Sequence, residues 1–200
     1  MRYLSIDLEA TGLAEDDRII EFAMIPFCTE TRTLEHKLAF HCFVKCESFE
    51  VLKPRLDPWV VEHNETLIRK AHKDGLEIDD FRIELQAHLE AREMKEYFKN
   101  EKNEKIILFG KSMNAIDLPF LNRDLGWNFM RKQFHHRDLD LSSTANTLID
   151  LGHLPPECSS GSELMKFMGM GAVSHTALED AKNTALMYLK MLEMFGKKKV

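Results

Sequence analysis

The sequence is poor in cysteine. Four cysteines, Cys28, Cys42, Cys46 and Cys158, occur in 200 residues. Small secreted domains held by disulfides carry a much denser cysteine framework, so this class of protein is excluded. The Cys42-x3-Cys46 pair has no second pair to match it and supplies only half of a structural zinc site. We therefore expect the fold to depend on its hydrophobic core and not on cross-links.

The sequence also lacks a hydrophobic run that could cross a bilayer, which takes about 20 apolar residues. The longest runs, such as residues 19–27, are much shorter, and Glu21 interrupts that one. The N-terminus has neither the basic nor the apolar region of a signal peptide. The sequence thus predicts a cytoplasmic protein with no membrane partner.

Positive charge is not in excess either. The 27 Lys and Arg residues face 33 Asp and Glu residues, a formal net charge of −6 at pH 7. A protein that coats long duplexes needs many cations on one face to neutralise phosphates, so this class is disfavoured, whereas short nucleic acid held by metal ions remains compatible. With 44% hydrophobic residues, no repeat and no linker, the chain is expected to form a single domain over residues 1–200.

Alternating residues at the start of the chain predict a half-buried strand over residues 3–9. Leu4, Ile6 and Leu8 share one face of this strand, and polar residues share the other. Residues 18–27 and 37–44 predict two further strands, with residues 29–33 as the turn between them. No crossover helix fits between these strands, so they are expected to form an antiparallel meander.

Helical periodicity follows, first after Pro58 and then over residues 79–100. Residues 106–109 and 139–141 predict two more strands, and helices are expected at 119–125, in the two segments after residue 141, and at 177–195. Strands first, then strands alternating with helices, indicate an α/β domain with a mixed five-stranded sheet flanked by helices.

Three groups of residues carry candidate chemistry. Asp7 and Glu9 are two residues apart on one strand, so their carboxylates project from the same face and suit joint metal ligation. Asp117 lies between a buried strand and a helix. His175 and Asp180 flank the start of the last helix, where Thr176 and Glu179 have the spacing of a capping box. Each group alone also fits a purely structural role, as a solvated strand face or as helix caps.

Together the three groups resemble the DEDDh exonuclease family, whose motifs occur here in the right order across nearly the whole chain. The segment Asp7-Leu8-Glu9-Ala10-Thr11-Gly12-Leu13 is similar to the first motif, Asp117 to the second, and His175-x4-Asp180 to the third. The His-x4-Asp spacing differs from the Tyr-x3-Asp of a sister group. The resemblance implies a ribonuclease H-like fold and removal of nucleotides from the 3′ end of a single strand.

Within that family the chain is most similar to the oligoribonuclease group. Trp59-x3-His63 resembles a Trp and His of that group, and the segment His136-Arg137-Asp138-Leu139-Asp140-Leu141-Ser142 resembles one of its strands. The resemblance implies short single-stranded RNA as substrate and a homodimer. In two places the chain departs from the group: His136 replaces a tyrosine, and the stretch from Ser112 to Asp117 is one residue longer. A DNA-directed or longer-RNA exonuclease of the same family therefore stays open, and so does, less favoured, an inactive nucleic-acid-binding domain.

The family also implies the roles of individual residues. The carboxylates Asp7, Glu9, Asp117 and Asp180 would hold two Mg²⁺ or Mn²⁺ ions, for which oxygen ligands are suited, and His175 would be the general base. Stacking and polar groups would position the strand. Residues expected in this substrate-binding role are Leu13, Trp59, His63, Ser112 and Arg137.

Overall fold

One mixed sheet organises the computed structural model, which describes residues 1–99, 105–171 and 176–196. The strand order is β3-β2-β1-β5-β6, and β4 also pairs with β2. The strands β1 to β4 pair antiparallel, whereas β5 and β6 run parallel to β1 and to each other. The α/β class and the antiparallel meander followed by parallel strands are therefore confirmed. The strands are β1 (Arg2–Ala10), β2 (Ile19–Cys28), β3 (Thr33–Leu34), β4 (Phe40–Phe43), β5 (Leu108–Gly110) and β6 (Leu139–Asp140).

The predicted number of five strands is wrong for the described part of the chain, which has six. The extra strand, β3, has only two residues and lies at the end of the predicted turn, where it pairs with Phe27 and Cys28. Three predicted strands are also shorter than expected. A 3-10 helix, His36–Leu38, precedes β4, Ile106 forms only an isolated bridge with Phe134, and Leu141 begins α7 instead of ending β6.

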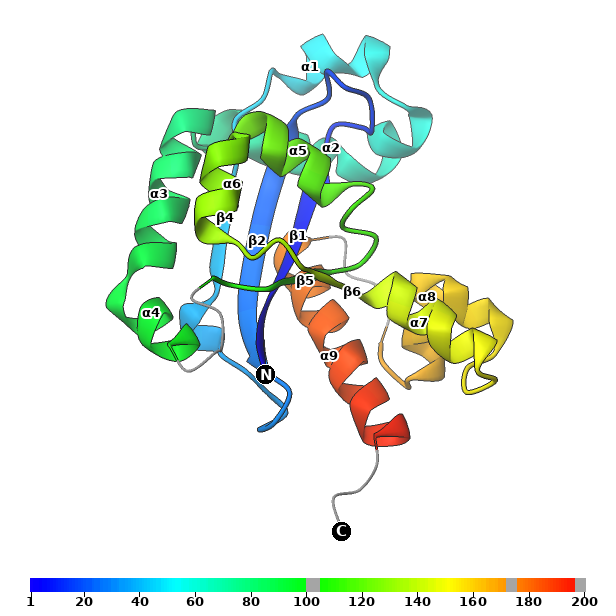
Figure 1. The fold of residues 1–200 in the computed structure, drawn as a ribbon. Helices are drawn as coiled ribbons and strands as arrows, with labels where there is room; N and C mark the ends of the chain where they lie inside the picture. Colours follow the sequence, from blue (N-terminus) through cyan, green and yellow to red (C-terminus); the bar gives the residue numbers. More distant parts are fainter. Residues whose placement is uncertain (100–104, 172–175, 197–200) are drawn as a thin grey trace.

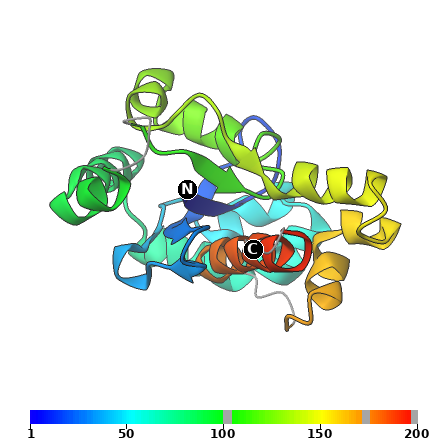
Figure 2. The same cartoon turned by 60° about the horizontal axis from the view of Figure 1, so that its bottom comes forward.

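Helices cover both faces of the sheet (Figures 1 and 2). On one face, α3 and the α5–α6 pair pack against Leu4, Ile6 and Leu8 of β1. On the other face α9 lies along the sheet, with α7 and α8 beside it. The α-helices are α1 (Phe49–Leu52), α2 (Pro58–Asp74), α3 (Ile78–Glu90), α4 (Arg92–Phe98), α5 (Asp117–Asp124), α6 (Trp127–Gln133), α7 (Leu141–Asp150), α8 (Gly161–Phe167) and α9 (Ala177–Phe195); the other 3-10 helices are Lys53–Arg55 and Pro156–Ser159.

Most predicted helices are present, with two differences. The helix expected over residues 79–100 is broken at Ala91, whose extended backbone (ψ 149°) separates α3 from α4. The helix α5 begins at Asp117, two residues earlier than predicted. None of the described helices has the length and apolar character that crossing a membrane requires.

Candidate active site

The polar face of β1 is turned toward α9 and not toward solvent. Ser5 is fully buried, and its hydroxyl donates a hydrogen bond of 2.7 Å to the carbonyl oxygen of Ala181 in α9. Ala177, Ala181 and Ala185 are also fully buried. Small side chains on this stripe of α9 let the helix approach the strand closely. The solvated strand face considered as an alternative is therefore wrong, and Asp7 and Glu9 lie on the same covered face as Ser5.

Three carboxylates meet where β1 and the first turn of α9 come together. Asp7, Glu9 and Asp180 each offer one oxygen atom, and these three atoms all lie within 4.8 Å of one another. Each of the three side chains is partly buried. Such a group of anions is unfavourable without a compensating cation, so the geometry fits the binding of a divalent metal.

Asp117 of α5 is a fourth carboxylate, outside the group of three but near enough to Asp7 for its charge to raise the pKa of Asp7. It is the first residue of this helix and is buried. The turn before it is fixed by Asp140, which accepts a hydrogen bond of 3.0 Å from the backbone N–H of Met113. The Met113 carbonyl oxygen in turn accepts from the N–H of Leu118 at 2.9 Å. The position of Asp117 thus depends on a hydrogen-bonded turn as well as on the helix.

The pKa of Asp7 shows how strongly these carboxylates interact. Burial raises the pKa of Asp7 well above its ordinary value, and the charge of Asp117 raises it further. Glu9 and Asp180 act in the same direction, and the ammonium group of Lys111 opposes them. Asp7 is therefore the carboxylate on which the negative charges of the site converge.

Glu9 and Asp117 hold their protons to near-neutral pH as well. Burial, followed by the charges of Asp180 and Glu21, raises the pKa of Glu9 to about 7. Burial also raises the pKa of Asp117 to about 7, although hydrogen bonds from the backbone of Asp117 and Leu8 oppose the shift. Perturbed carboxylates of this kind concentrate at functional sites.

Two residues that support the site have no signal in the local sequence pattern. Asn64 of α2 is buried, and its side chain hydrogen-bonds Glu9, which lowers the pKa of that carboxyl. Glu21 of β2 is buried opposite Glu9 in the strand register. Its carboxylate accepts from the N–H of Ala177 at the start of α9.

The capping box predicted at the start of α9 is not formed. Thr176 is the N-cap but makes no side-chain capping bond, and Glu179 pairs with Lys182 at 2.6 Å.

Beside the carboxylates lies an apolar cavity of about 450 Å³. The structure brings Leu13 and Trp59 together in its wall, next to Glu9 and Asn64. Leu13 is 76% exposed and Trp59 is 51% exposed. The ring of His63 does not line the cavity but stacks on the Trp59 ring, with centroids 4.4 Å apart. The alternative of Trp59 as an ordinary core residue is therefore wrong.

The two residues expected near a phosphate are placed differently. Ser112 has a left-handed backbone (φ 55°), and its hydroxyl lies 2.9 Å from that of Ser142. Arg137 is exposed between α6 and β6, and its backbone N–H donates to the His135 ring. Among the described contacts none joins Arg137 to Ser112.

The predicted general base His175 lies outside the described residues.

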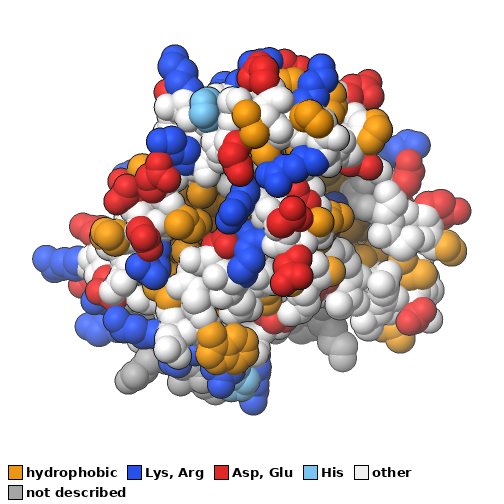
Figure 3. Space-filling view, turned by 90° about the horizontal axis from the view of Figure 1, so that it is seen from above, with side chains coloured by type: hydrophobic (Ala, Val, Ile, Leu, Met, Phe, Trp, Pro, Cys, Tyr) orange, Lys and Arg blue, Asp and Glu red, His pale blue; other side chains and the backbone are white. Residues whose placement is uncertain are grey.

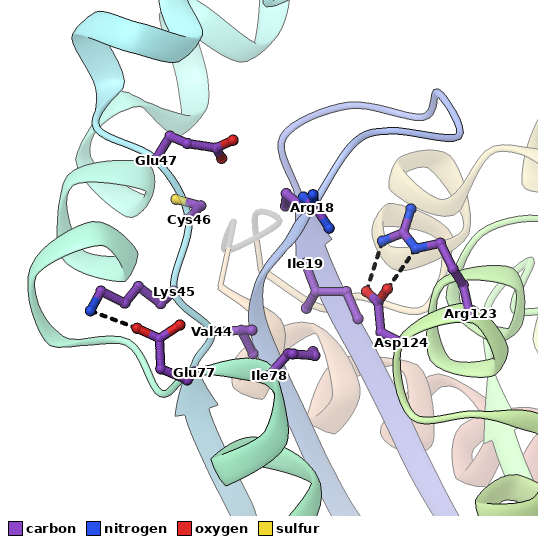
Figure 4. A pocket seen from close by; sticks show the side chains of 10 residues that line it. All are labelled: Arg18, Ile19, Val44, Lys45, Cys46, Glu47, Glu77, Ile78, Arg123 and Asp124. Atoms are coloured by element: carbon purple, nitrogen blue, oxygen red, sulfur yellow. Dashed lines mark hydrogen bonds and ion pairs between the residues drawn. The ribbon is translucent and has the colours of Figure 1, made fainter.

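A larger cavity, of about 500 Å³, contains none of the predicted site residues. Most of the charged residues that line this cavity form ion pairs with one another: Lys45 pairs with Glu77, and Arg123 pairs with Asp124 (Figure 4). On the face shown in Figure 3, acidic and basic side chains are intermixed and form no broad basic surface among the described residues. The carboxylate cluster is therefore the stronger candidate for the active site.

The fold and the site define an α/β protein with a carboxylate cluster suited to divalent metal ions. The family model described as RNase_T, exonuclease, matches residues 4–188. The chain belongs to this exonuclease family, which confirms the family predicted from the three motifs. No curated protein gives a significant sequence match to the chain.

Three solved structures, two of them named as 3′-exonucleases, share the fold at low identity. The chain is 18% identical to a full-length 3′-exonuclease (TM-score 0.65), covering 96% of this chain and 60% of the other. It is 18% identical to the nuclease domain of 3′hExo, a DEDDh family member bound to rAMP (TM-score 0.61; 96% and 92% covered). The third is the Mg²⁺- and Mn²⁺-bound form of S. pombe Pop2p, at 12% identity (TM-score 0.67; 96% and 83% covered). The chain thus spans less than two thirds of the full-length 3′-exonuclease.

Proposed function

We propose that this chain is a divalent-metal-dependent 3′-to-5′ exonuclease that hydrolyses short single-stranded RNA to 5′-mononucleotides, as the oligoribonuclease resemblance implies. The observation that carries the proposal is the cluster of Asp7, Glu9 and Asp180 oxygens within 4.8 Å of one another. Membership of the exonuclease family supports it. The rAMP bound to the 3′hExo nuclease domain supports RNA as the substrate class.

The residues present fit a metal site by their chemistry. Asp7, Glu9, Asp117 and Asp180 offer hard oxygen ligands, and Mg²⁺ and Mn²⁺ prefer such ligands. Burial, together with the charges of neighbouring carboxylates, raises the pKa values of Asp7, Glu9 and Asp117, and a bound cation would offset both effects. The Mg²⁺ and Mn²⁺ bound to Pop2p, which has the same fold, support these two metals. When bound, two ions would activate water and stabilise the charge that develops on the phosphate.

The protein groups would hold the strand and move the proton. Leu13 and Trp59 line the apolar cavity and are suited to receive the terminal base, with His63 supporting Trp59 by stacking. His175 would accept the proton of the attacking water, since a neutral imidazole is available at pH 7. Ser112 and Arg137 would bind the 5′ phosphate of a short substrate.

The assembly of the enzyme is part of the same proposal. We expect a single exonuclease domain that works as a homodimer, with the partner contributing near Arg137. Light scattering at assay concentration tests the dimer. A monomer with activity undiminished by dilution contradicts it.

The test of function uses the full chain and labelled oligonucleotides of 2 and 20 nucleotides, as RNA and as DNA. We expect stepwise loss from the 3′ end, faster for short RNA, that stops in EDTA and returns with Mg²⁺ or Mn²⁺. A strand blocked at its 3′ end is the control and should survive. Full activity in chelator contradicts the metal site, and faster turnover of DNA or of the 20-mer redirects the substrate class.

A further inference from the structure

An aromatic and basic surface lies between α5, α6 and the segment that leads to β6. We define the Trp127 patch as Trp127, Arg131, His135 and His136. The Trp127 ring is 61% exposed, which is unusual for a side chain whose burial contributes so much free energy. Hydrophobic, basic and histidine side chains gather at the lower edge of the face in Figure 3. An exposed aromatic ring among cations is the composition of a single-strand stacking platform.

The rings of the Trp127 patch are held in place by their neighbours. The Arg131 guanidinium lies over the Trp127 ring, with its carbon 5.1 Å from the ring centroid. The rings of His135 and His136 stack with centroids 4.3 Å apart. All four side chains line one cavity of about 320 Å³ between α5, α6 and the segment that leads to β6. A base that enters here meets ring faces that are already oriented.

Arg131 carries the permanent positive charge of the Trp127 patch, and among the described ion pairs none joins it to a carboxylate. Electrostatic repulsion from His135, followed by burial and then by the charges of Arg137 and Arg131, lowers the pKa of His136 and favours its neutral ring. The only acidic residue among the described residues that line the cavity is Asp138, which accepts a bond of 3.4 Å from Asn114. The larger cavity in Figure 4 differs, because two of its cations, Lys45 and Arg123, are paired with carboxylates that also line it. Arg131 is therefore the group of the patch that is suited to pair with a phosphate, and the rings of Trp127 and the two histidines are suited to contact a base.

Two residues that line the cavity of the Trp127 patch lie close to Asp117 in the sequence. Leu118, which lines it, directly follows Asp117. Asn114 also lines it and belongs to the turn that carries Ser112. The patch and Asp117 therefore both lie at the start of α5, and a strand that extends from the carboxylates to the patch would pass this point.

We propose that the Trp127 patch binds nucleotides on the 5′ side of the cleaved bond. The proposal rests on the exonuclease function proposed above. A base contacts the rings of Trp127 and the two histidines, and Arg131 contacts a phosphate. RNA of several nucleotides should then gain binding free energy from the patch, whereas a dinucleotide is too short to reach it and gains none.

Binding is measured first, by the anisotropy of a labelled RNA ten-mer in chelator, so that hydrolysis does not interfere. We expect Trp127→Ala to weaken binding about tenfold, as for the loss of one base–aromatic stack. Arg131→Gln should reduce the slope of log Kd against log salt by about 0.7, the value for one phosphate contact on a single strand. Ile83→Ala is the control, because Ile83 on α3 is also 61% exposed.

Turnover is measured next, as the ratio of kcat/KM for the ten-mer to kcat/KM for a dinucleotide. This ratio should fall about tenfold in Trp127→Ala and stay unchanged in Ile83→Ala. Unchanged ten-mer binding in folded Trp127→Ala and Arg131→Gln overturns the patch. A patch variant that turns a dimer into a monomer in light scattering also overturns it, in favour of a contact between copies. If the wild type binds the ten-mer but hydrolyses nothing with Mg²⁺ or Mn²⁺, the proposed function fails, and the binding data alone decide the patch.

Discussion

Glu21 of β2 anchors the first residue of α9, because its carboxylate accepts a hydrogen bond of 3.1 Å from the backbone N–H of Ala177. The other carboxylate oxygen of Glu21 pairs with the ring of His41 on β4. Glu21 is also the register partner of Glu9 on β1. One buried side chain therefore ties the strand that carries Glu9 to the helix that carries Asp180.

Removing this anchor should weaken the metal site before it unfolds the protein. We expect Glu21→Ala to bind Mn²⁺ about 10-fold or more weakly, as for other residues that orient metal ligands. It should also lose about 1–3 kcal/mol of unfolding free energy, since the Ala177 N–H loses its acceptor. Glu21→Gln keeps an acceptor and should be intermediate. Mn²⁺ titration followed by calorimetry measures the affinity.

The control for Glu21 is Glu179→Ala in the same turn of α9. Glu179 is exposed and loses only its surface pair with Lys182, so less than about 0.5 kcal/mol is expected. Equal Mn²⁺ affinity in Glu21→Ala and Glu179→Ala would show that the anchor does not position Asp180.

The metal-free protein should become less stable as pH rises from about 4 to 7. Glu9 and Asp117 titrate near pH 7 in the folded state and near pH 4 when unfolded. Between these values the folded state binds more protons than the unfolded state, so the unfolding free energy falls with increasing pH. Thermal unfolding in chelator measures this. Mg²⁺ or Mn²⁺ should stabilise the protein more at pH 8 than at pH 5, because metal binds the ionised carboxylates.

Asp7→Asn separates stability from activity at the same site. It should raise Tm in chelator at pH 8 by about 2–4 °C, the shift for about 1 kcal/mol in a chain of this size, because it relieves the repulsion centred on Asp7. It should also cut hydrolysis by orders of magnitude. Asp74→Asn, at the exposed end of α2, should change neither quantity. A lower Tm for Asp7→Asn in chelator would contradict the repulsion.

Asp140 should control the turn that leads to Asp117. One of its oxygens accepts from the Met113 N–H, and the other accepts from the Ser143 N–H at 2.9 Å and caps α7. Asp140→Ala should therefore lose about 1–2 kcal/mol of stability and some of kcat. Asp140→Asn can keep the cap, because asparagine is a good N-cap, but not both bonds. We expect near wild-type stability with a reduced kcat, measured by thermal unfolding and by initial rates. Full kcat in Asp140→Asn would show that the Met113 bond does not place Asp117.

Local patterns in the sequence predicted the strand β1 and the helix α9, which supply Asp7, Glu9 and Asp180. The alternation on β1 placed Asp7 and Glu9 on one face, and α9 has the predicted bounds Ala177–Phe195. The support from Glu21 and Asn64 could not be predicted in this way. Their partners belong to other elements of the fold, and a buried carboxylate on a strand has no local periodicity that distinguishes it from a solvated one.

The end of α3 at Ala91 and the short strand β3 could not be predicted from local sequence patterns either. No glycine or proline marks the end of α3 at Ala91, and the two residues of β3 are too few to show an alternation. The role of Trp59 could be predicted only from the family resemblance. Trp59 lies beside Leu13 in the wall of the cavity because of the position of α2, and local sequence patterns do not predict that position.

The last prediction is that His175 sets the acid limb of the pH profile when metal is saturating. Saturating metal keeps the carboxylates ionised, so their titration should not limit the rate. The remaining group is the imidazole, whose ordinary pKa is about 6.5 and whose neutral form alone can accept the proton. We expect log kcat to rise with unit slope below about pH 6.5 and to flatten above it. At low metal concentration the limb should shift to higher pH, because protons then compete with metal for Glu9 and Asp117.

His175→Ala should cost about 10²-fold or more in kcat and remove the acid limb, while Mn²⁺ affinity stays near the wild-type value. His153→Ala, at an exposed histidine stacked on Phe195, is the matched control and should keep the wild-type profile. The comparison separates two origins of the limb. If His175→Ala keeps the acid limb at saturating metal, another group accepts the proton, and the limb then belongs to the carboxylates that bind the metal.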